Sequence, residues 1–137
     1  MKLQPDANPN LNTVTSYGEN HIEINTVRYD QSVLLMPEGP VLTWPVERFE
    51  DLNVGHFEQI AQQVPALVIL GSGKRIRFPH PSLFAPLIAA KIGIETMDLQ
   101  AACRTYNILM GEGRQVLAAL ILESWSPYSW GGDINLI

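Results

Sequence analysis

Residues 66–73 read Ala-Leu-Val-Ile-Leu-Gly-Ser-Gly, and this stretch decides the fold. Its first five residues are all apolar, as in an interior strand that is covered on both faces of a sheet. The Gly71-Ser72-Gly73 turn follows at once. Beyond the turn the chain alternates between helical and strand patterns, which predicts an α/β domain whose sheet has parallel members.

Three helices and two further strands are predicted around this strand. Before it, Asn53 caps a helix that runs to about Gln63, with an inner face of Phe57, Ile60, Ala61 and Val64, and Pro65 ends it. After it, a helix from about Ser82 to Lys91 places Leu83, Leu87 and Ile88 inward and is closed by Gly93. A strand follows over 94–97. Asp98 then caps a helix over 99–110, with Gly111 or Gly113 as its stop, and the last predicted strand covers 115–122.

The front of the chain predicts a different kind of structure. His21 to Asn25 alternates polar and apolar residues, the period of a half-buried strand. Residues 32–36 form a short β-rich run, and residues 41–44 return across the Pro37-Glu38-Gly39-Pro40 turn. Three or four short antiparallel strands are expected between residues 13 and 46. We divide the chain into a flexible arm over 1–11, one α/β domain over 12–122, and an aromatic tail over 123–137.

Composition and charge exclude several classes of protein. The chain has 137 residues and a net charge of -5, which speaks against a broad nucleic-acid-binding face. The charge is uneven, because residues 1–65 hold three basic and nine acidic residues and residues 66–122 hold six basic and three acidic ones. The N-terminus resembles no targeting signal, no stretch has the length of a transmembrane segment, and Cys103 has no second cysteine to pair with. The cytoplasm is the expected location.

The Gly71-Ser72-Gly73-Lys74 turn departs from the known phosphate-binding motifs. A P-loop requires glycine where Val68 stands and a hydroxyl residue where Arg75 stands. Two interpretations remain. The turn and the cations after it bind a small anion, or the turn is a tight connection whose Lys and Arg side chains are solvated, and the pattern favours the second.

The helix over 99–110 has two informative faces. Cys103 lies on an apolar stripe with Leu99, Ala102, Tyr106 and Met110, so we expect a buried, unreactive thiol. Gln100, Arg104, Asn107 and Gly111 share another face, which either lines a pocket or is solvated.

The three histidines lack the spacing of metal ligands, and no catalytic residue, metal site or cofactor is predicted. The tail residues Trp125, Tyr128 and Trp130 dock either on the body or on a partner.

Several segments together resemble the family that includes the mitochondrial respiratory complex I assembly factor 3. They are Gly71-Ser72-Gly73, Arg77-Phe78-Pro79, Met97-Asp98-Leu99, residues 101–107 (Ala-Ala-Cys-Arg-Thr-Tyr-Asn) and Glu112-Gly113-Arg114. Ser72 and Leu99 each stand where the family pattern has threonine. The likeness covers about residues 12–122 and is most specific in the second half.

The resemblance implies a three-layer domain, with a central mixed sheet, helices on one side and a small antiparallel β unit on the other. It implies no enzymatic activity, and it implies a role in assembly through protein contacts. Two hypotheses follow. The first is a non-enzymatic interaction module with a protein partner. The second is a domain, or even an enzyme, that binds a small anionic ligand in a pocket formed by Gly71, Ser72, Gly73, Arg77, Arg104, Thr105 and Asn107.

Overall fold

The computed structural model describes residues 10–123 of the chain. Its elements run in the order β1 (Val14–Tyr17), β2 (Ile22–Ile24), β3 (Val27–Tyr29), β4 (Val33–Leu35), β5 (Leu42–Thr43), η1 (Phe49–Asp51), α1 (Val54–Ala61), β6 (Leu67–Gly71), η2 (Pro81–Phe84), α2 (Ala85–Ala89), β7 (Gly93–Met97), α3 (Leu99–Gly111) and β8 (Val116–Leu120). The two 3-10 helices, η1 and η2, are short connections.

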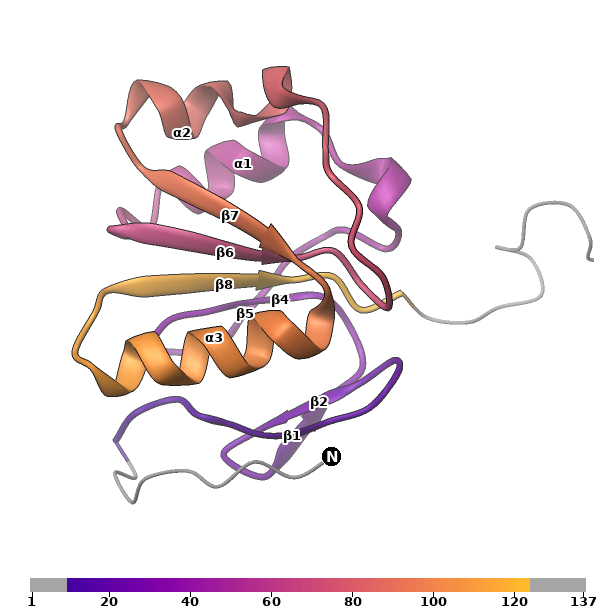
Figure 1. Ribbon diagram of the computed structural model, residues 1–137, viewed down its shortest axis with the longest axis vertical. Coiled ribbons are helices and arrows are strands. Elements are labelled where there is room, and N and C mark those ends of the chain that lie inside the picture. The colour runs from indigo at the N-terminus through magenta and orange to yellow at the C-terminus, as the bar shows by residue number, and fades with distance from the viewer. Residues whose placement is uncertain (1–9, 124–137) are drawn as a thin grey trace, which may run out of the picture.

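The central sheet is mixed and has five strands in the order β5-β4-β8-β6-β7 (Figure 1). Strand β6 is parallel to both of its neighbours, β7 and β8, whereas β4 is antiparallel to β8 and β5. Strands β1, β2 and β3 form a separate antiparallel sheet. The α/β fold class with a mixed sheet and a small antiparallel unit is therefore confirmed.

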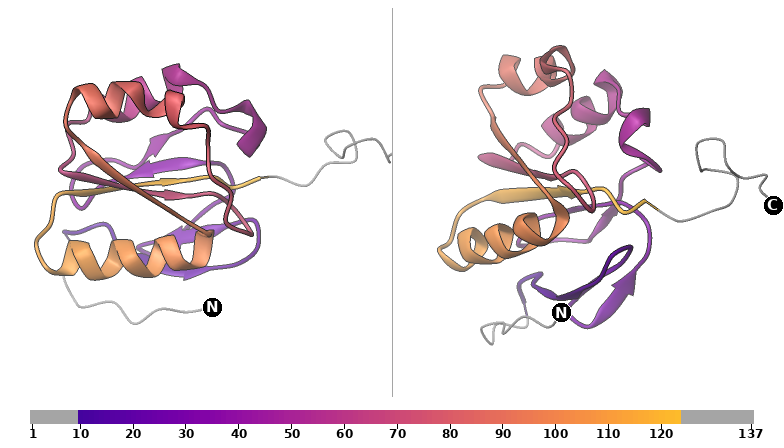
Figure 2. Two further views of the ribbon diagram at one scale, coloured as in Figure 1. Left: turned by 45° about the horizontal axis from the view of Figure 1, so that its top comes forward. Right: turned by 45° about the vertical axis from the view of Figure 1, so that its right-hand side comes forward.

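The two faces of the central sheet are covered differently. Helices α1 and α2 lie over one face, and α3 lies on the opposite side together with the three-stranded sheet (Figures 1 and 2). Each face has its own hydrophobic core: Ile69 packs with α3 and the small sheet, and Val68 and Leu70 pack with α1 and α2. The apolar run of β6 is explained by this double coverage.

The predicted helices are present, with differences at their ends. Helix α1 begins after Asn53, and α3 begins after Asp98, whose carboxylate accepts a hydrogen bond from the Ala101 amide at 2.9 Å. The inward placement of two residues is wrong, because Val64 is 79% exposed and Ile88 is 68% exposed. Val64 lies beyond the end of α1, so the helical period no longer applies to it.

The second helical region also begins and ends differently from the prediction. It is divided into η2 and the five-residue α2, because three prolines fall within residues 79–86. Gly93 does not close this helix and is instead the first residue of β7. The chain reverses at Lys91, which adopts a positive φ of 59°.

The front of the chain forms short strands, as its β-rich runs predict, but five of them instead of three or four. Residues 13–46 hold five strands, β1 to β5, of which β2 matches the alternating run over 21–25 and β4 and β5 match the pair across the proline turn. The predicted arm and the aromatic tail fall almost wholly outside the described residues. No helix within residues 10–123 has both the length and the apolar character needed to span a membrane.

Val64 provides a test of the backbone geometry at the end of α1. It is a β-branched residue with φ of 53°, in the left-handed region that L-residues enter at a cost of about 1–2 kcal/mol. Because asparagine tolerates this region better, we expect Val64→Asn to raise the free energy of unfolding by about 1 kcal/mol, measured by urea denaturation. The control is Val27→Asn in β3, which is also exposed but has no positive φ and is expected to give no gain. Equal stabilities of the two variants would contradict the assignment of strain to Val64.

Candidate functional site

The predicted Gly-Ser-Gly turn lies at the carboxyl end of β6 and is buried. Gly71, Ser72 and Gly73 are all buried, whereas Lys74, Arg75 and Ile76 are exposed. A Cβ atom on Gly71 would lie 3.0 Å from Leu120 Cδ2 and 3.1 Å from Ala102 Cβ. A side chain at this position would therefore press against α3 and β8, and Ala102 and Leu120 would have to shift to admit it.

Ser72 holds the turn in place through both its backbone and its side chain. Its amide donates to the Met97 carbonyl at 2.8 Å. Its hydroxyl lies 2.9 Å from the Arg75 carbonyl and 3.2 Å from the Met97 carbonyl, and it accepts from the Arg77 amide at 2.9 Å. The donor groups of Ser72 are thus used within the chain, which leaves neither of them for an anion.

Arg77 connects the loop after β6 to two other parts of the molecule. Its guanidinium donates to the Ser72 carbonyl at 3.0 Å and forms ion pairs with Glu123 at 2.9 Å and Glu50 at 3.5 Å. It also stacks over the Phe49 ring, 4.6 Å from the centroid, as a cation–π contact. The planar guanidinium suits this role because it pairs at its edge and stacks on its face.

Glu123 is the most connected acidic residue of this cluster, and sequence reasoning assigned it to the tail instead. Its carboxylate pairs with Arg77 and accepts a hydrogen bond from the Phe49 amide at 2.8 Å. The sequence did hold a signal for Glu123: it follows the apolar run of β8, whose carboxyl end meets that of the parallel strand β6.

The other predicted site residues lie on α3 and face the small sheet. The Asn107 amide accepts from the Val14 amide at 3.0 Å and donates to the Val14 carbonyl at 2.9 Å. This pairing on both backbone groups of one residue is what a neighbouring β-strand would supply. Arg104 is exposed and donates to the Tyr17 hydroxyl at 3.1 Å, and Thr105 is half-buried. The face of α3 that carries Asn107 and Arg104 therefore contacts strand β1.

The structure divides the seven predicted site residues into two groups. Gly71, Ser72, Gly73 and Arg77 surround the carboxyl end of β6, and Arg104, Thr105 and Asn107 lie on α3. No hydrogen bond or ion pair within residues 10–123 joins the groups directly. The β1–β2 hairpin bonds to the α3 group through Tyr17 and Arg104, and its Glu19 pairs at 3.2 Å with Lys74, the residue after Gly73. The small-anion pocket stays a prediction.

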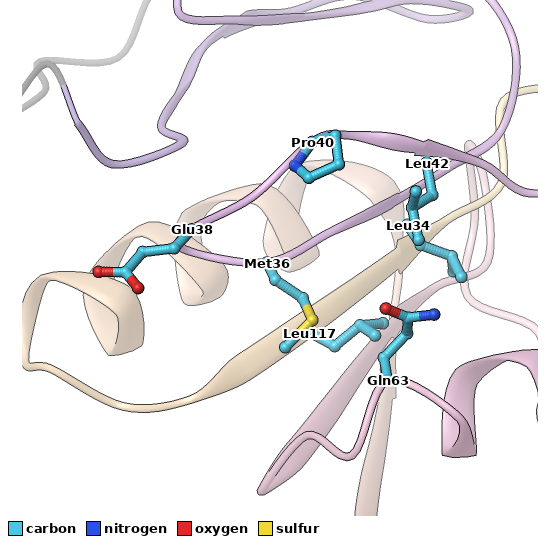
Figure 3. Close-up of a pocket in the computed structure, with 7 residues that line it drawn as sticks. All are labelled: Leu34, Met36, Glu38, Pro40, Leu42, Gln63 and Leu117. Carbon is cyan, nitrogen blue, oxygen red and sulfur yellow. The ribbon is translucent and has the colours of Figure 1, made fainter.

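A cavity lies on the β4–β5 side of the sheet, away from all seven predicted residues. It has a volume of about 80 Å³ and is lined by Leu34, Met36, Glu38, Pro40, Leu42, Gln63 and Leu117 (Figure 3). Its walls are mostly apolar. Within the described part of the chain, no group of three or more His, Cys, Asp or Glu side chains is arranged to hold a metal ion.

Cys103 lies in the core between α3 and the central sheet, as its apolar stripe predicts. Its exposed fraction is 0%, and the other members of the stripe are also buried. Burial raises the pKa of the Cys103 thiol from 9.0 to about 12, although the nearby Arg104 charge opposes the shift. A thiol with such a pKa carries almost no thiolate near pH 7, so the expectation of an unreactive cysteine agrees with its surroundings.

The described geometry defines an α/β domain with a mixed five-stranded sheet and a separate three-stranded antiparallel sheet. A family model described as a protein of unknown function (DUF498/DUF598) matches residues 14–121, and the chain belongs to this family. The resemblance drawn from the sequence motifs is thereby confirmed.

Two relatives carry the name of the assembly factor whose family the sequence motifs resemble. The chain is 29% identical over 110 residues to the Bos taurus NADH dehydrogenase [ubiquinone] 1 alpha subcomplex assembly factor 3, covering 79% of this chain and 59% of that protein. It is 31% identical over 116 residues to the Drosophila melanogaster protein of the same name, covering 79% of this chain and 57% of that protein. The chain thus spans somewhat under three fifths of the length of these relatives.

Solved structures of bacterial proteins share the fold. A Bordetella parapertussis protein is 44% identical with a TM-score of 0.79, covering 86% of this chain and 100% of that one. A Bordetella pertussis protein described as a Mth938-like domain is 38% identical with a TM-score of 0.78, covering 92% of this chain and 95% of that one. These likenesses agree with the sheet and the helix placement described above.

The bonds of Asn107 to β1 can be tested by replacement. We expect Asn107→Leu to lower the free energy of unfolding by about 2–4 kcal/mol, because Val14 is fully buried and both of its backbone groups would lose their partner. Gln100→Leu at an exposed position of the same helix is the matched control and is expected to change stability by less than about 0.5 kcal/mol. Chemical denaturation of both variants provides the comparison, and equal losses would rule out the special role of Asn107.

The raised pKa of Cys103 predicts a loss of stability in alkali. Between pH 9 and 12 the unfolded chain releases the thiol proton while the folded protein keeps it, so the free energy of unfolding falls as pH rises. The expected slope from this group approaches about 1.4 kcal/mol per pH unit. Denaturation of wild type and Cys103→Ala from pH 8 to 10 measures it, and the variant is expected to show the shallower slope. Parallel curves would mean that the thiol ionises equally in both states.

Proposed function

We propose that this protein is a non-enzymatic interaction module that binds another protein. The support begins with three signature residues whose side chains are bonded within the chain, although the buried Nε of Arg77 makes no hydrogen bond within residues 10–123. The Ser72 hydroxyl, the Arg77 guanidinium and the Asn107 amide each make two or more internal polar contacts. To bind a substrate they would have to break these bonds, and a buried group left unpaired costs about 1–3 kcal/mol.

The single observation that carries the proposal is the exposure of Phe78. The Phe78 side chain is 70% exposed and Ile76 is 48% exposed, on either side of the firmly held Arg77. A large aromatic side chain exposed on a well-held segment has the character of an interface anchor, because aromatic residues dominate the binding energy of many protein interfaces. The names of the curated relatives, which are assembly factors, point the same way.

Affinity capture tests the proposed function. The full chain and its Phe78→Ser variant serve as baits in cells that express the protein. Ile108→Ser on α3 is the matched control, because Ile108 is 61% exposed, close to the 70% of Phe78. We expect wild type and Ile108→Ser to retain the same protein in comparable amounts and Phe78→Ser to retain at least tenfold less. Thermal melting of the three proteins shows that each is folded. If wild type retains no protein reproducibly, the proposed function is wrong.

A further inference from the structure

The cavity between the β4–β5 turn and the end of α1 is a feature that the proposed function does not use. Its floor is formed by Leu34 of β4 and Leu117 of β8, which are buried and belong to the core under α1 and α2. Glu38 and Pro40 on the turn are exposed, so the cavity opens to solvent on that side. A pocket that reaches from the surface into a core is suited to an apolar group that enters from outside.

The size of the cavity limits what it can hold. Its volume is about 80 Å³. A cavity of about 150 Å³ holds benzene, so by proportion this one holds about three or four carbon atoms. Most of its wall consists of Leu and Met side chains, namely Leu34, Met36, Leu42 and Leu117. The apolar part of a ligand is therefore a short aliphatic chain, such as a propyl group.

Gln63 adds a neutral polar side chain to this apolar wall. Figure 3 shows its amide directed toward Leu34 and Leu117. Gln59, one turn earlier in the chain, uses its amide to donate to the Thr43 carbonyl at 3.4 Å. The Gln63 side-chain amide, by contrast, makes no hydrogen bond to any residue within 10–123, although Gln63 is half-buried. Its donors and its acceptor oxygen are thus available to a group in the cavity.

The backbone next to Gln63 is held in an unfavourable conformation. Val64 has a φ of 53° and is 79% exposed, so burial of its own side chain does not account for this conformation. The Val64 amide donates to the Ala61 carbonyl at 3.0 Å, at the point where the chain leaves α1. Residues in rarely populated backbone regions cluster at binding sites. The turn after α1 thus sets the Gln63 side chain in place at the cavity.

The polar group of the ligand follows from Gln63 and Glu38. A primary amide presents a donor and an acceptor side by side, and another carboxamide matches both with two parallel hydrogen bonds. An amine in its charged form has no acceptor for the Gln63 donors. Glu38 is the one charged residue among those that line the cavity, and it is exposed at the opening. Its carboxylate repels an anion, which favours a neutral carboxamide over the corresponding carboxylate.

From these observations we infer that the cavity is a binding site for a small aliphatic carboxamide. The alkyl chain lies against Leu34 and Leu117, and the carboxamide pairs with Gln63. Gln63 is assigned as the residue that sets specificity, and Glu38 as the residue that disfavours anions. The inference goes beyond the proposed function, because Phe78 and its loop are not among the residues that line the cavity.

Titration of the full chain with three ligands of equal size, followed by heteronuclear NMR, tests the inference. Butyramide carries the inferred group, methyl propyl ketone has a methyl group in place of the amino group, and butyrate has a charged oxygen there. We expect butyramide at millimolar concentration to shift the backbone amide signals of Met36, Leu42 and Gln63 in a saturable way. Its affinity is expected to exceed those of the ketone and of butyrate by about fivefold or more, because each of them lacks the amide donor.

Matched variants separate the role of the Gln63 amide from general effects. Gln63→Met keeps the length of the side chain without its hydrogen bonds. It is expected to weaken butyramide binding about fivefold or more and to leave ketone binding within about twofold of wild type. Gln62→Met makes the same change at an exposed neighbouring position and is expected to leave all three affinities unchanged. Glu38→Gln is expected to strengthen butyrate binding. Thermal melting shows that each variant is folded.

Several outcomes would overturn the inference. One is a set of shifts that do not saturate or that fall on residues away from the cavity, which would mean contact at high concentration only. Equal affinities for butyramide and the ketone, or unchanged binding to Gln63→Met, would remove the role of Gln63. Tighter binding after deletion of residues 2–9 would make the chain's own N-terminal residues the occupant.

This titration and the affinity capture succeed or fail separately. Phe78→Ser is expected to leave butyramide binding unchanged, because Phe78 does not line the cavity. Gln63→Met is expected to retain the captured protein in the same amount as wild type. A negative titration therefore leaves the proposed function standing, and a negative capture leaves the carboxamide site standing.

Discussion

The burial of β6 between two hydrophobic cores is the constraint on which the rest of the structure depends. Because both of its neighbours in the sheet are parallel to it, each connection has to cross a face of the sheet, and helices supply that crossing. Val68 and Leu70 meet α1 and α2 on one side, and Ile69 meets α3 and the small sheet on the other. A polar residue in this strand would be buried on either face.

The same strand determines where the polar network forms. Parallel strands bring their carboxyl ends to one edge of the sheet, so the loop after β6 and the residue after β8 meet there. Arg77 from the loop and Glu123 from the end of β8 form their ion pair at this edge, and Phe49 of η1 packs on the guanidinium. The network joins three segments that are far apart in the chain, and it leaves Ile76 and Phe78 on the outside.

A second network holds the small sheet to the central domain. Asn107 bonds to both backbone groups of Val14, and the Tyr106 hydroxyl donates to the Asn12 carbonyl at 2.7 Å. Asn107 thus acts on β1 as a neighbouring strand would act, and Tyr106 holds the chain just before it. The family signature on α3 consequently has a structural purpose on each face: Cys103 and its stripe fill the core, and Asn107 fastens the three-stranded sheet.

The sequence by itself determined the fold class, the interior strand, the caps at Asn53 and Asp98, and the buried stripe of α3. These features are local, because hydrophobic period and capping chemistry act over a few residues. Tertiary structure alone decided the partners of Arg77 and Asn107, the outward turn of Val64 and Ile88, and the place of Glu123 within the domain instead of a tail. Each of these depends on residues brought together from distant parts of the chain, and single-sequence periodicity carries no information on which segments meet.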